Sequence, residues 1–229
     1  MNEKTQLRNT LSALRAVIPD KVQKDKLIFY RLTDFLRAEF PNVKTVFTYV
    51  SMNSEADTRR FIESADDYTL YFPYTASGVM RPVLAERRTG LYTDKQGNVI
   101  NYANISEYGI ADKNVGARRA LPKTENSAEF FGQGTPCPYK KSLNSGQISA
   151  LDITIVPLLG FNESLHRIGH GKGCYDRYFT VGGDLSGAPP DTVKIGLAYD
   201  EQFCSFTPEA YDVPLDYIIT PTRKLTVGS

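Results

Sequence analysis

The segment with the clearest chemical potential is a glycine-rich loop, residues 167–177, with the sequence RIGHGKGCYDR. Its glycines alternate at positions 169, 171 and 173. Glycine adopts positive φ angles readily and lets backbone N–H groups approach an anion closely. Lys172 within the loop and Arg167 at its edge add positive charge, and a predicted helix directly after the loop directs its positive end to the same place. This combination suits a polyphosphate.

The loop differs from two common phosphate-binding motifs. Lys172 is followed by Gly173, where a P-loop has Ser or Thr. Cys174 stands where the third glycine of the dinucleotide motif GxGxxG would fall. The alternative to an anion site is a tight strand-to-helix connection with incidental charge, although three alternating glycines around a lysine exceed what a turn needs.

Two carboxylates are candidate ligands for Mg²⁺. Asp176 falls in the first turn of the helix predicted after the loop, where the helix dipole by itself also explains a carboxylate. Beside a phosphate-binding loop, a carboxylate is the usual way to hold Mg²⁺, which prefers oxygen ligands. Asp212 lies in a loop between two apolar segments and is either a second ligand or an ordinary turn residue.

The remaining polar candidates are weaker on local pattern alone. His166 and His170 are four residues apart, but the neighbouring glycines disfavour a helix and no zinc motif accompanies them, so we interpret them as loop residues, with His170 near a ligand. Cys174 has no general base beside it in the sequence, which argues against a nucleophile. Lys4 and Arg8 are one helical turn apart and, taken alone, form a solvated basic edge.

The elements that must position these residues follow from the apolar spacing. Two apolar stripes predict two helices in the first forty residues, separated by Pro19 and by Asp20 as an N-cap. The stripes comprise Leu7, Leu11, Leu14 and Ile18, followed by Ile28, Leu32 and Phe35. Further helices are expected at 54–65 and 175–179, and strands at 43–50, 68–72, 151–157, 193–199 and 217–219, with hairpins over 80–102.

Alternating strands and helices predict an α/β fold with a mainly parallel sheet covered on both faces. The continuous apolar run at 151–157 suits a central strand. No internal repeat or domain boundary is visible, so we expect one domain over residues 1–229. Residues 113–149 are rich in Gly, Pro, Ser, Asn and Lys with little periodicity, which predicts a long loop or surface insertion.

The composition limits the class of protein. Lys plus Arg number 27 and Asp plus Glu 26, giving a net charge of +1, which argues against a dedicated nucleic-acid binder. The chain has no apolar run of membrane-spanning length, and its first residues lack the apolar core of a signal peptide. The three cysteines are odd in number and widely spaced, so neither a disulfide framework nor a zinc site is expected and a reducing cytoplasm is the predicted location.

Several segments together resemble the 5-formyltetrahydrofolate cyclo-ligases, also called 5,10-methenyltetrahydrofolate synthetases. They are KTQLR near the amino terminus, YVSMNSEADT, LDITIVPLLGF, RIGHGKGCYDRY, KIGLAYDEQ and EAYDVPLDYIIT. The resemblance covers most of the chain except its middle. It implies a three-layer α/β/α domain that converts 5-formyltetrahydrofolate and ATP to 5,10-methenyltetrahydrofolate, ADP and phosphate with Mg²⁺. It further implies small-molecule partners only, without nucleic acid or membrane, and we expect a monomer.

The resemblance also implies roles for individual residues. Asp176 and Asp212 hold Mg²⁺, and Val50 and Glu55 bind the folate together with part of the glycine loop. The residues implied to bind ATP are Lys4, Arg8, Arg167, Gly169, His170, Gly171, Lys172, Gly173, Cys174 and Tyr175. Those of the loop that also face the folate are His170, Gly171, Lys172, Gly173 and Cys174. We predict Arg167, Lys172 and Tyr175 as the catalytic group.

Two departures from the family pattern leave other functions open. Cys174 stands where the family has the first Tyr of Gly-Tyr-Tyr-Asp, and residues 113–149 are longer than usual and lack the Gly-Ile-x-x-Pro pattern. A non-catalytic nucleotide- or folate-binding relative is one alternative. Another is a sugar-phosphate isomerase on a related fold, whose loop binds a phosphate monoester. RNA binding is the least favoured, since no basic-aromatic motif is present.

Overall fold

The computed structural model describes residues 3–52, 54–76, 79–84, 87–88, 91–92, 151–180 and 191–227. The predicted insertion at 113–149 and the later part of the hairpin region predicted over 80–102 therefore lie outside the described residues. Within the described part, no helix is both long and apolar enough to cross a bilayer.

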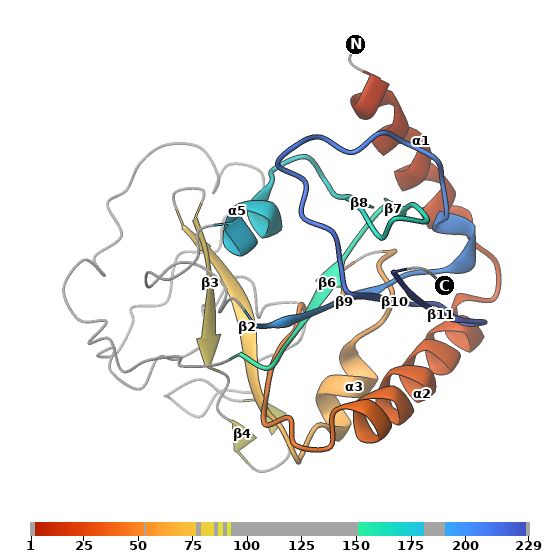
Figure 1. The fold of residues 1–229 in the computed structure, drawn as a ribbon. Coiled ribbons are helices and arrows are strands. Elements are labelled where there is room, and N and C mark those ends of the chain that lie inside the picture. The colour runs from red at the N-terminus through yellow and green to blue at the C-terminus, as the bar shows by residue number, and fades with distance from the viewer. Residues whose placement is uncertain are drawn as a thin grey trace, which may run out of the picture.

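A seven-stranded sheet in the order β11-β10-β9-β6-β1-β2-β3 forms the centre of the described structure (Figure 1). The five strands from β10 to β2 run parallel, and the two edge strands β11 and β3 pair antiparallel. This arrangement confirms the mainly parallel sheet predicted from the sequence. The strands are β1 (Thr45–Phe47), β2 (Thr69–Ala76), β3 (Val79–Leu84), β6 (Ile153–Pro157), β9 (Val193–Leu197), β10 (Tyr217–Ile219) and β11 (Lys224–Thr226).

Successive residues of the central strands enter different cores on the two faces of the sheet, because side chains alternate along a strand. In β6, Ile155 packs with α2 (Lys21–Glu39) and α3 (Arg59–Ser64), whereas Val156 packs on the opposite face. Ile219 and Ile218 of β10 divide in the same way. The second face is covered by α5 (Cys174–Thr180) and by the segment around the hairpin of β7 (Gly160–Phe161) and β8 (Arg167–Ile168).

The first two helices form where predicted, with two differences. Asp20 is the N-cap residue of α2 as predicted, but it adopts φ 55° and its side chain makes no capping hydrogen bond. In α1 (Glu3–Val17), Leu14 is 36% exposed whereas Arg15 is only 4% exposed. The Arg15 guanidinium donates to the Leu158 carbonyl at 2.9 Å, which satisfies a buried charge that the apolar stripe did not reveal.

The helix predicted at 54–65 begins only at Arg59. Polar side chains hold the preceding residues in an irregular turn instead, as short polar side chains often do by bonding to nearby backbone. The Asp57 carboxylate accepts the Ser51 hydroxyl at 2.7 Å and the Arg59 N–H at 3.0 Å. The Thr58 hydroxyl donates to the Tyr49 carbonyl at 2.8 Å.

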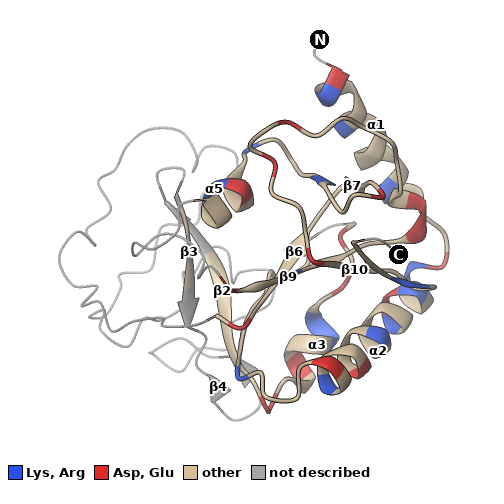
Figure 2. Ribbon diagram, viewed as in Figure 1, with Lys and Arg blue, Asp and Glu red and all other residues tan. Residues whose placement is uncertain are grey.

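Smaller elements complete the described structure. They are β4 (Arg87–Arg88), β5 (Leu91–Tyr92) and the 3₁₀ turn η3 (Asp200–Gln202). β3 overlaps the start of the hairpin region predicted over 80–102 and pairs antiparallel with β2, and within that region β4 and β5 pair antiparallel. On α2, Lys and Arg are interspersed with Asp and Glu (Figure 2), in keeping with the near-neutral balance of the whole chain.

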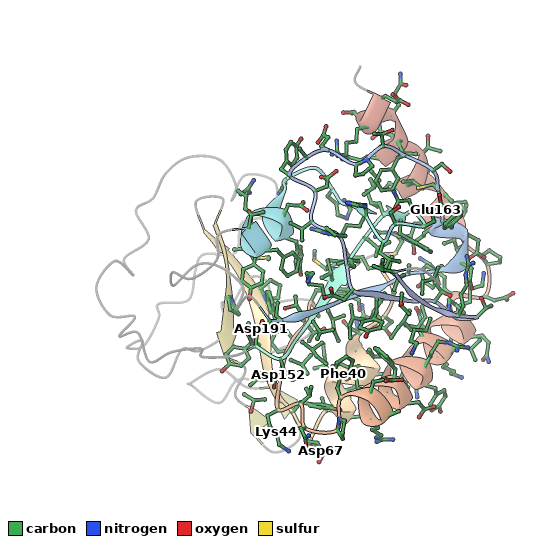
Figure 3. All side chains as sticks on the ribbon, in the orientation of Figure 1. Phe40, Lys44, Asp67, Asp152, Glu163 and Asp191 are labelled. Carbon is green, nitrogen blue, oxygen red and sulfur yellow. The ribbon has the colours of Figure 1, made fainter. Side chains whose placement is uncertain are left out.

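Asp152 joins the amino-terminal ends of β6 and β1, on the lower side of the molecule in Figure 3. Its carboxylate accepts the Lys44 and Thr45 N–H groups, both at 2.8 Å, and the Thr45 hydroxyl at 2.9 Å. Partial burial alone would raise the pKa of Asp152, but these hydrogen bonds outweigh it and hold the pKa below its ordinary value. The ionised form therefore stabilises the fold.

We predict that Asp152→Asn lowers the free energy of unfolding at pH 7 by about 1 kcal/mol, because it weakens charge-assisted hydrogen bonds. A carboxylate with a lowered pKa stabilises the folded state above its unfolded pKa, and this contribution is lost on acidification. The difference between the two proteins in urea unfolding should therefore shrink below about pH 4. Asp191→Asn, at an exposed position nearby, is the control. A difference that persists undiminished at low pH would contradict the role given to the Asp152 charge.

Candidate active site at a switch point of the sheet

The predicted site residues gather beyond the carboxyl ends of the parallel strands. From β1 the chain continues to β2 on one side of the sheet, whereas from β6 it continues to β9 and β10 on the other. The segments that leave β1 and β6 therefore diverge, and such a switch point is where open α/β sheets bind ligands. The segment after β1 carries Glu55, the one after β6 carries the glycine loop, and the one between β9 and β10 carries Asp212.

The glycine loop connects β8 to α5 with two of its glycines in the left-handed region. Gly171 has φ 90° and Gly173 has φ 58°, which explains why glycine occupies both positions. Gly169 does not share this conformation, and a Cβ added there meets no heavy atom of the described residues within 4 Å. The Arg8 Nε donates to the Gly169 carbonyl at 3.1 Å and lies over Gly171, so the amino-terminal helix contacts the loop.

Arg167 belongs to β8, which precedes the loop, and its side chain contacts α5 and the segment before β10. Its side chain is 4% exposed, and its guanidinium donates to the Asp176 carboxylate and to the Val213 carbonyl, both at 2.9 Å. Burial lowers the pKa of Arg167 while Asp176 opposes that shift, and a guanidinium stays charged at neutral pH. The same Asp176 oxygen accepts the Val213 N–H at 3.2 Å. Asp176 is thereby placed beside the residue that follows Asp212.

Lys4 joins the amino-terminal helix to the segment that contains Asp212. Its ammonium group lies 2.7 Å from the Asp212 carboxylate and 2.9 Å from the Glu209 carboxylate. Partial burial would lower the pKa of Lys4, but these hydrogen bonds outweigh it and raise the pKa. Burial would likewise raise the pKa of Asp212, which Lys4 and the Glu209 N–H hold below its ordinary value. Both groups are therefore charged at neutral pH.

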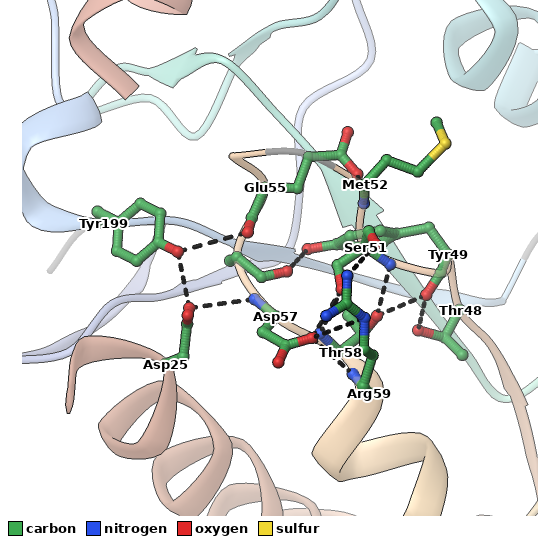
Figure 4. A network of polar contacts seen from close by, with 11 residues as sticks. Asp25, Thr48, Tyr49, Ser51, Met52, Glu55, Asp57, Thr58, Arg59 and Tyr199 are labelled. Atoms are coloured by element: carbon green, nitrogen blue, oxygen red, sulfur yellow. Dashed lines mark hydrogen bonds and ion pairs between the residues drawn. The ribbon is translucent and has the colours of Figure 1, made fainter. Parts of the chain in front are cut away.

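Glu55 presents its carboxylate toward the glycine loop from the opposite side. The side chain is 8% exposed, and its Oε1 lies 3.8 Å from the Nε2 of His170, which is 56% exposed. The other oxygen accepts the Met52 N–H at 2.9 Å, and the Glu55 N–H donates to the Met52 carbonyl at 3.0 Å, which closes a tight turn (Figure 4). The sequence interpretation of Glu55 as the first turn of a helix is therefore wrong.

The other predicted residues are placed less tightly. Val50 is half-buried and packs against the core under α2. Lys172 is exposed at the top of the loop, and the Cys174 thiol accepts a long contact of 3.9 Å from Arg177. Burial raises the pKa of Tyr175 far above its ordinary value, so its phenol stays protonated at physiological pH and is unsuited to act as a base.

The donor set fits Mg²⁺ in type. Asp176 and Asp212 are neighbours through Val213, and the hydrogen bonds described above use one oxygen of each carboxylate. Mg²⁺ is commonly held by one or two carboxylates together with substrate phosphates and water. Among the described residues, no three His, Cys, Asp or Glu side chains converge as a complete protein-only site. The two aspartates therefore suit a metal that arrives with phosphate.

Sequence reasoning missed Glu209, Arg15 and Tyr199 at this end of the sheet. Glu209 shares Lys4 with Asp212, and the only local signal was its three-residue spacing from Asp212. Arg15 lies beside the apolar stripe of α1, and its long-range partners Ser54 and Leu158 give no signal in the local sequence. Tyr199 contacts residues near Glu55 from far along the chain, which no local pattern indicates.

The sequence was compared with known families and curated proteins. The model of the 5-formyltetrahydrofolate cyclo-ligase family matches residues 1–221. The chain is 46% identical over 78 residues to the 5-formyltetrahydrofolate cyclo-ligase of Mycoplasma genitalium, covering 33% of this chain and 44% of that protein. It is 24% identical over 223 residues to that of Mycolicibacterium smegmatis, covering 97% and 95%. The matches to the two Mycoplasma relatives thus span about half the length of those proteins.

Two solved structures share the fold. A 5,10-methenyltetrahydrofolate synthetase from Mycoplasma pneumoniae has a TM-score of 0.58 at 22% identity, covering 96% of this chain and 99% of the other. The synthetase from Aquifex aeolicus has a TM-score of 0.59 at 18% identity, covering 99% and 93%. These likenesses confirm the predicted α/β fold class.

We predict that alanine substitutions at two glycines of the loop, Gly169 and Gly171, have different effects on stability. Gly171→Ala should lower the free energy of unfolding by about 1–2 kcal/mol, because φ 90° is strained for alanine and the new Cβ lies 3.2 Å from the Arg8 Nε. Gly169→Ala should leave it unchanged, since its Cβ points into open space. Thermal or urea unfolding measures both. Equal effects of the two substitutions would contradict the loop conformation described here.

Proposed function

Because the chain belongs to the 5-formyltetrahydrofolate cyclo-ligase family, we propose that it converts 5-formyltetrahydrofolate and ATP to 5,10-methenyltetrahydrofolate, ADP and phosphate with Mg²⁺. One observation carries the proposal. Residues that the family resemblance assigns to nucleotide, metal and folate come from four distant segments and meet at the switch point between β1 and β6.

The proposed chemistry explains why the site needs charge and positioning more than a nucleophile. A formamide oxygen is a poor leaving group, so it first attacks the γ-phosphorus of ATP, forming a P–O bond as ADP leaves. N10 then attacks the formyl carbon, the C–O bond breaks and phosphate departs, while N10 loses its proton. Phosphoryl transfer depends mainly on alignment and on neutralisation of charge.

In this proposal the phosphates lie against the glycine loop. Gly169 offers the closest approach, because no side chain fills the space in front of it. Lys172 and Arg8 supply charge from the solvent side and from α1. Arg167 supplies charge from behind the loop and orients Asp176 through their 2.9 Å contact. The neutral Tyr175 packs close to Arg167, with the guanidinium 6.0 Å from its ring centre.

Asp176 and Asp212 would hold Mg²⁺, which when bound would neutralise phosphate charge and orient the γ-phosphate. Lys4 forms an ion pair with Asp212. Phosphate oxygens are alternative partners for Lys4, so binding of the nucleotide would release Asp212 toward the cation. We therefore expect metal and nucleotide to bind together.

On the other side of the site, Glu55 is proposed to accept hydrogen bonds from the amide-like edge of the pterin. Its buried carboxylate is already held by the Met52 N–H, which fixes its direction before substrate arrives. His170 belongs to the glycine loop and lies 3.8 Å from Glu55, so it connects the folate and nucleotide sides. Val50 would contribute an apolar contact nearby.

The proposal predicts that the purified protein forms the methenyl chromophore only when 5-formyltetrahydrofolate, ATP and Mg²⁺ are all present. One ADP should form for each methenyl group, because one phosphoryl transfer activates each formyl oxygen. Absorbance follows the methenyl product, and a coupled assay follows ADP. Folded protein that binds ATP and the folate without turnover would identify a non-catalytic relative instead. Folded protein that binds neither would overturn the proposal.

We further predict that Asp212→Asn raises the Mg²⁺ concentration needed for half-maximal activity by about tenfold or more, since even residues that only support a metal ligand cost about 10–100-fold. The matched control is Glu209→Gln, which also removes a carboxylate from Lys4 but from outside the proposed metal pair. Its Mg²⁺ requirement should match that of the wild type. If both variants shift the requirement equally, the effect belongs to Lys4 and not to a metal ligand.

A further inference from the structure

We infer that Asp25 of α2 is a positioning residue for the folate side of the site, acting through the backbone of the 54–57 turn to direct the Glu55 carboxylate. This inference rests on the proposed function, in which Glu55 binds the folate. Asp25 is 30 residues before Glu55 in the sequence. It belongs to α2, which covers the face of the sheet opposite to α5. It was not among the residues predicted from the sequence.

The direction of the Glu55 carboxylate depends on the conformation of its own backbone. Residues 54–57 have no regular secondary structure, so no helical or sheet hydrogen bonds hold them. Glu55 itself is bonded to Met52 through one backbone and one side-chain hydrogen bond. Beyond this and the local bonds of Asp57 and Thr58, contacts with distant elements help to set the position of the turn, because a loop without such contacts samples several conformations.

Asp25 contacts the turn after Glu55 directly and contacts Glu55 itself through Tyr199 (Figure 4). Its Oδ1 accepts the Asp57 N–H at 3.1 Å, two residues after Glu55. The same oxygen accepts the Tyr199 hydroxyl at 2.7 Å, and that hydroxyl lies 3.4 Å from the Glu55 carbonyl oxygen. In Figure 4 the Glu55 carbonyl faces Tyr199 while its carboxylate points to the Met52 side. Asp25 thus holds the backbone and does not touch the carboxylate.

Tyr199, which lies between Asp25 and Glu55, is itself held in a fixed position. Its ring is fully buried beyond the carboxyl end of β9, and its N–H donates to the Gln202 side chain at 2.7 Å. The Gln202 amide donates in turn to the carbonyls of Leu158 and Leu159, at 3.0 and 2.9 Å. These residues follow β6 directly. These contacts thereby fix the position of the turn that carries Glu55 relative to β6, the strand that leads into the glycine loop.

Two basic side chains support the same turn at the preceding residue. The Lys21 ammonium donates to the Ser54 carbonyl at 2.7 Å, and the Arg15 Nε donates to the Ser54 hydroxyl at 3.1 Å. Partial burial raises the pKa of Asp25, and the charge of the Asp57 carboxylate adds to this rise, although the Tyr199 hydroxyl, the Asp57 N–H and Lys21 favour the ionised form. Placing a carboxylate here costs desolvation, and an apolar side chain would pack without that cost. The presence of a carboxylate at position 25 is therefore explained better by its role in positioning the turn than by a contribution to the stability of the fold.

The test compares Asp25→Ala with Asp25→Asn in the full-length chain. Alanine removes the acceptor for both hydrogen bonds, so 5-formyltetrahydrofolate measured by titration calorimetry should bind about tenfold more weakly. Asparagine keeps an acceptor oxygen and should restore most of the affinity. The KM for ATP should stay unchanged in both variants. Asp34→Ala, at an exposed position on the same helix, is the matched control and should bind folate normally.

A double variant separates positioning from general damage. If Asp25 acts through Glu55, then Asp25→Ala combined with Glu55→Gln should bind folate no more weakly than Glu55→Gln alone. Additive losses, or a parallel rise in the KM for ATP, would overturn the inference. Should Asp25→Ala fail to fold, Tyr199→Phe keeps the buried ring, removes only the hydroxyl and should show the same non-additivity.

The outcomes distinguish this inference from the proposed function on which it rests. If the wild type does not bind 5-formyltetrahydrofolate, the proposed function fails and the inference with it. If Glu55→Gln binds the folate as tightly as the wild type, the proposed role of Glu55 fails. If Glu55→Gln weakens binding while Asp25→Ala and Tyr199→Phe do not, the positioning inference alone is wrong.

Discussion

The buried guanidinium of Arg167 is the constraint on which the arrangement of the site depends. A charge removed from water requires a counter-charge and hydrogen-bond acceptors, and Arg167 finds them in the Asp176 carboxylate and the Val213 carbonyl. These partners belong to α5 and to the segment before β10. One buried cation therefore holds together the glycine loop, the short helix after it and the segment that carries Asp212.

The two sides of the site are built differently. Around Glu55, Asp25 accepts a hydrogen bond from the backbone, and Lys21 and Arg15 donate to the carbonyl and hydroxyl of Ser54, which fixes the turn. On the glycine-loop side, the long side chain of Lys4 pairs with the Asp212 carboxylate. In the proposed function, phosphate and metal would replace this ion pair without movement of the strands. A turn held by hydrogen bonds thus faces a set of ion pairs.

The charges of the site are balanced in pairs. Lys4 and Arg167 are each neutralised by an aspartate. In the proposed function, a polyphosphate alone would compete with these aspartates for the two cations, and a divalent cation alone would compete with Lys4 and Arg167 for the two aspartates. Arrival of both together would satisfy every group. The net charge of +1 for the whole chain conceals this local concentration of both signs.

Much of the fold and of the phosphate side of the site could be predicted from the sequence, because those features are local. Alternating glycines, the apolar run of β6 and the helical stripes of α1 and α2 each follow from short-range sterics or periodicity, and Gly171 and Gly173 adopt the positive φ angles expected of them. The family resemblance implied roles for Lys4 and Arg8 that no local pattern supplied, and it favoured one of the two local interpretations of Asp212. The structure then brought their segments together.

Only the tertiary structure decided which distant partners the polar side chains contact and which backbone groups they bond. Arg15 interrupts an apolar stripe yet is buried, because the Leu158 carbonyl 143 residues away satisfies it. The helix predicted at 54–65 begins only at Arg59, because Ser51, Asp57 and Thr58 bond to nearby backbone and side chains, and Asp25 and Tyr199 hold the resulting turn. By itself the sequence determined the fold class and the need for glycine at positions 171 and 173. The placement of Glu55 required the packed structure, because the residues that hold its turn meet only when α2 packs on the sheet that contains β1 and β9.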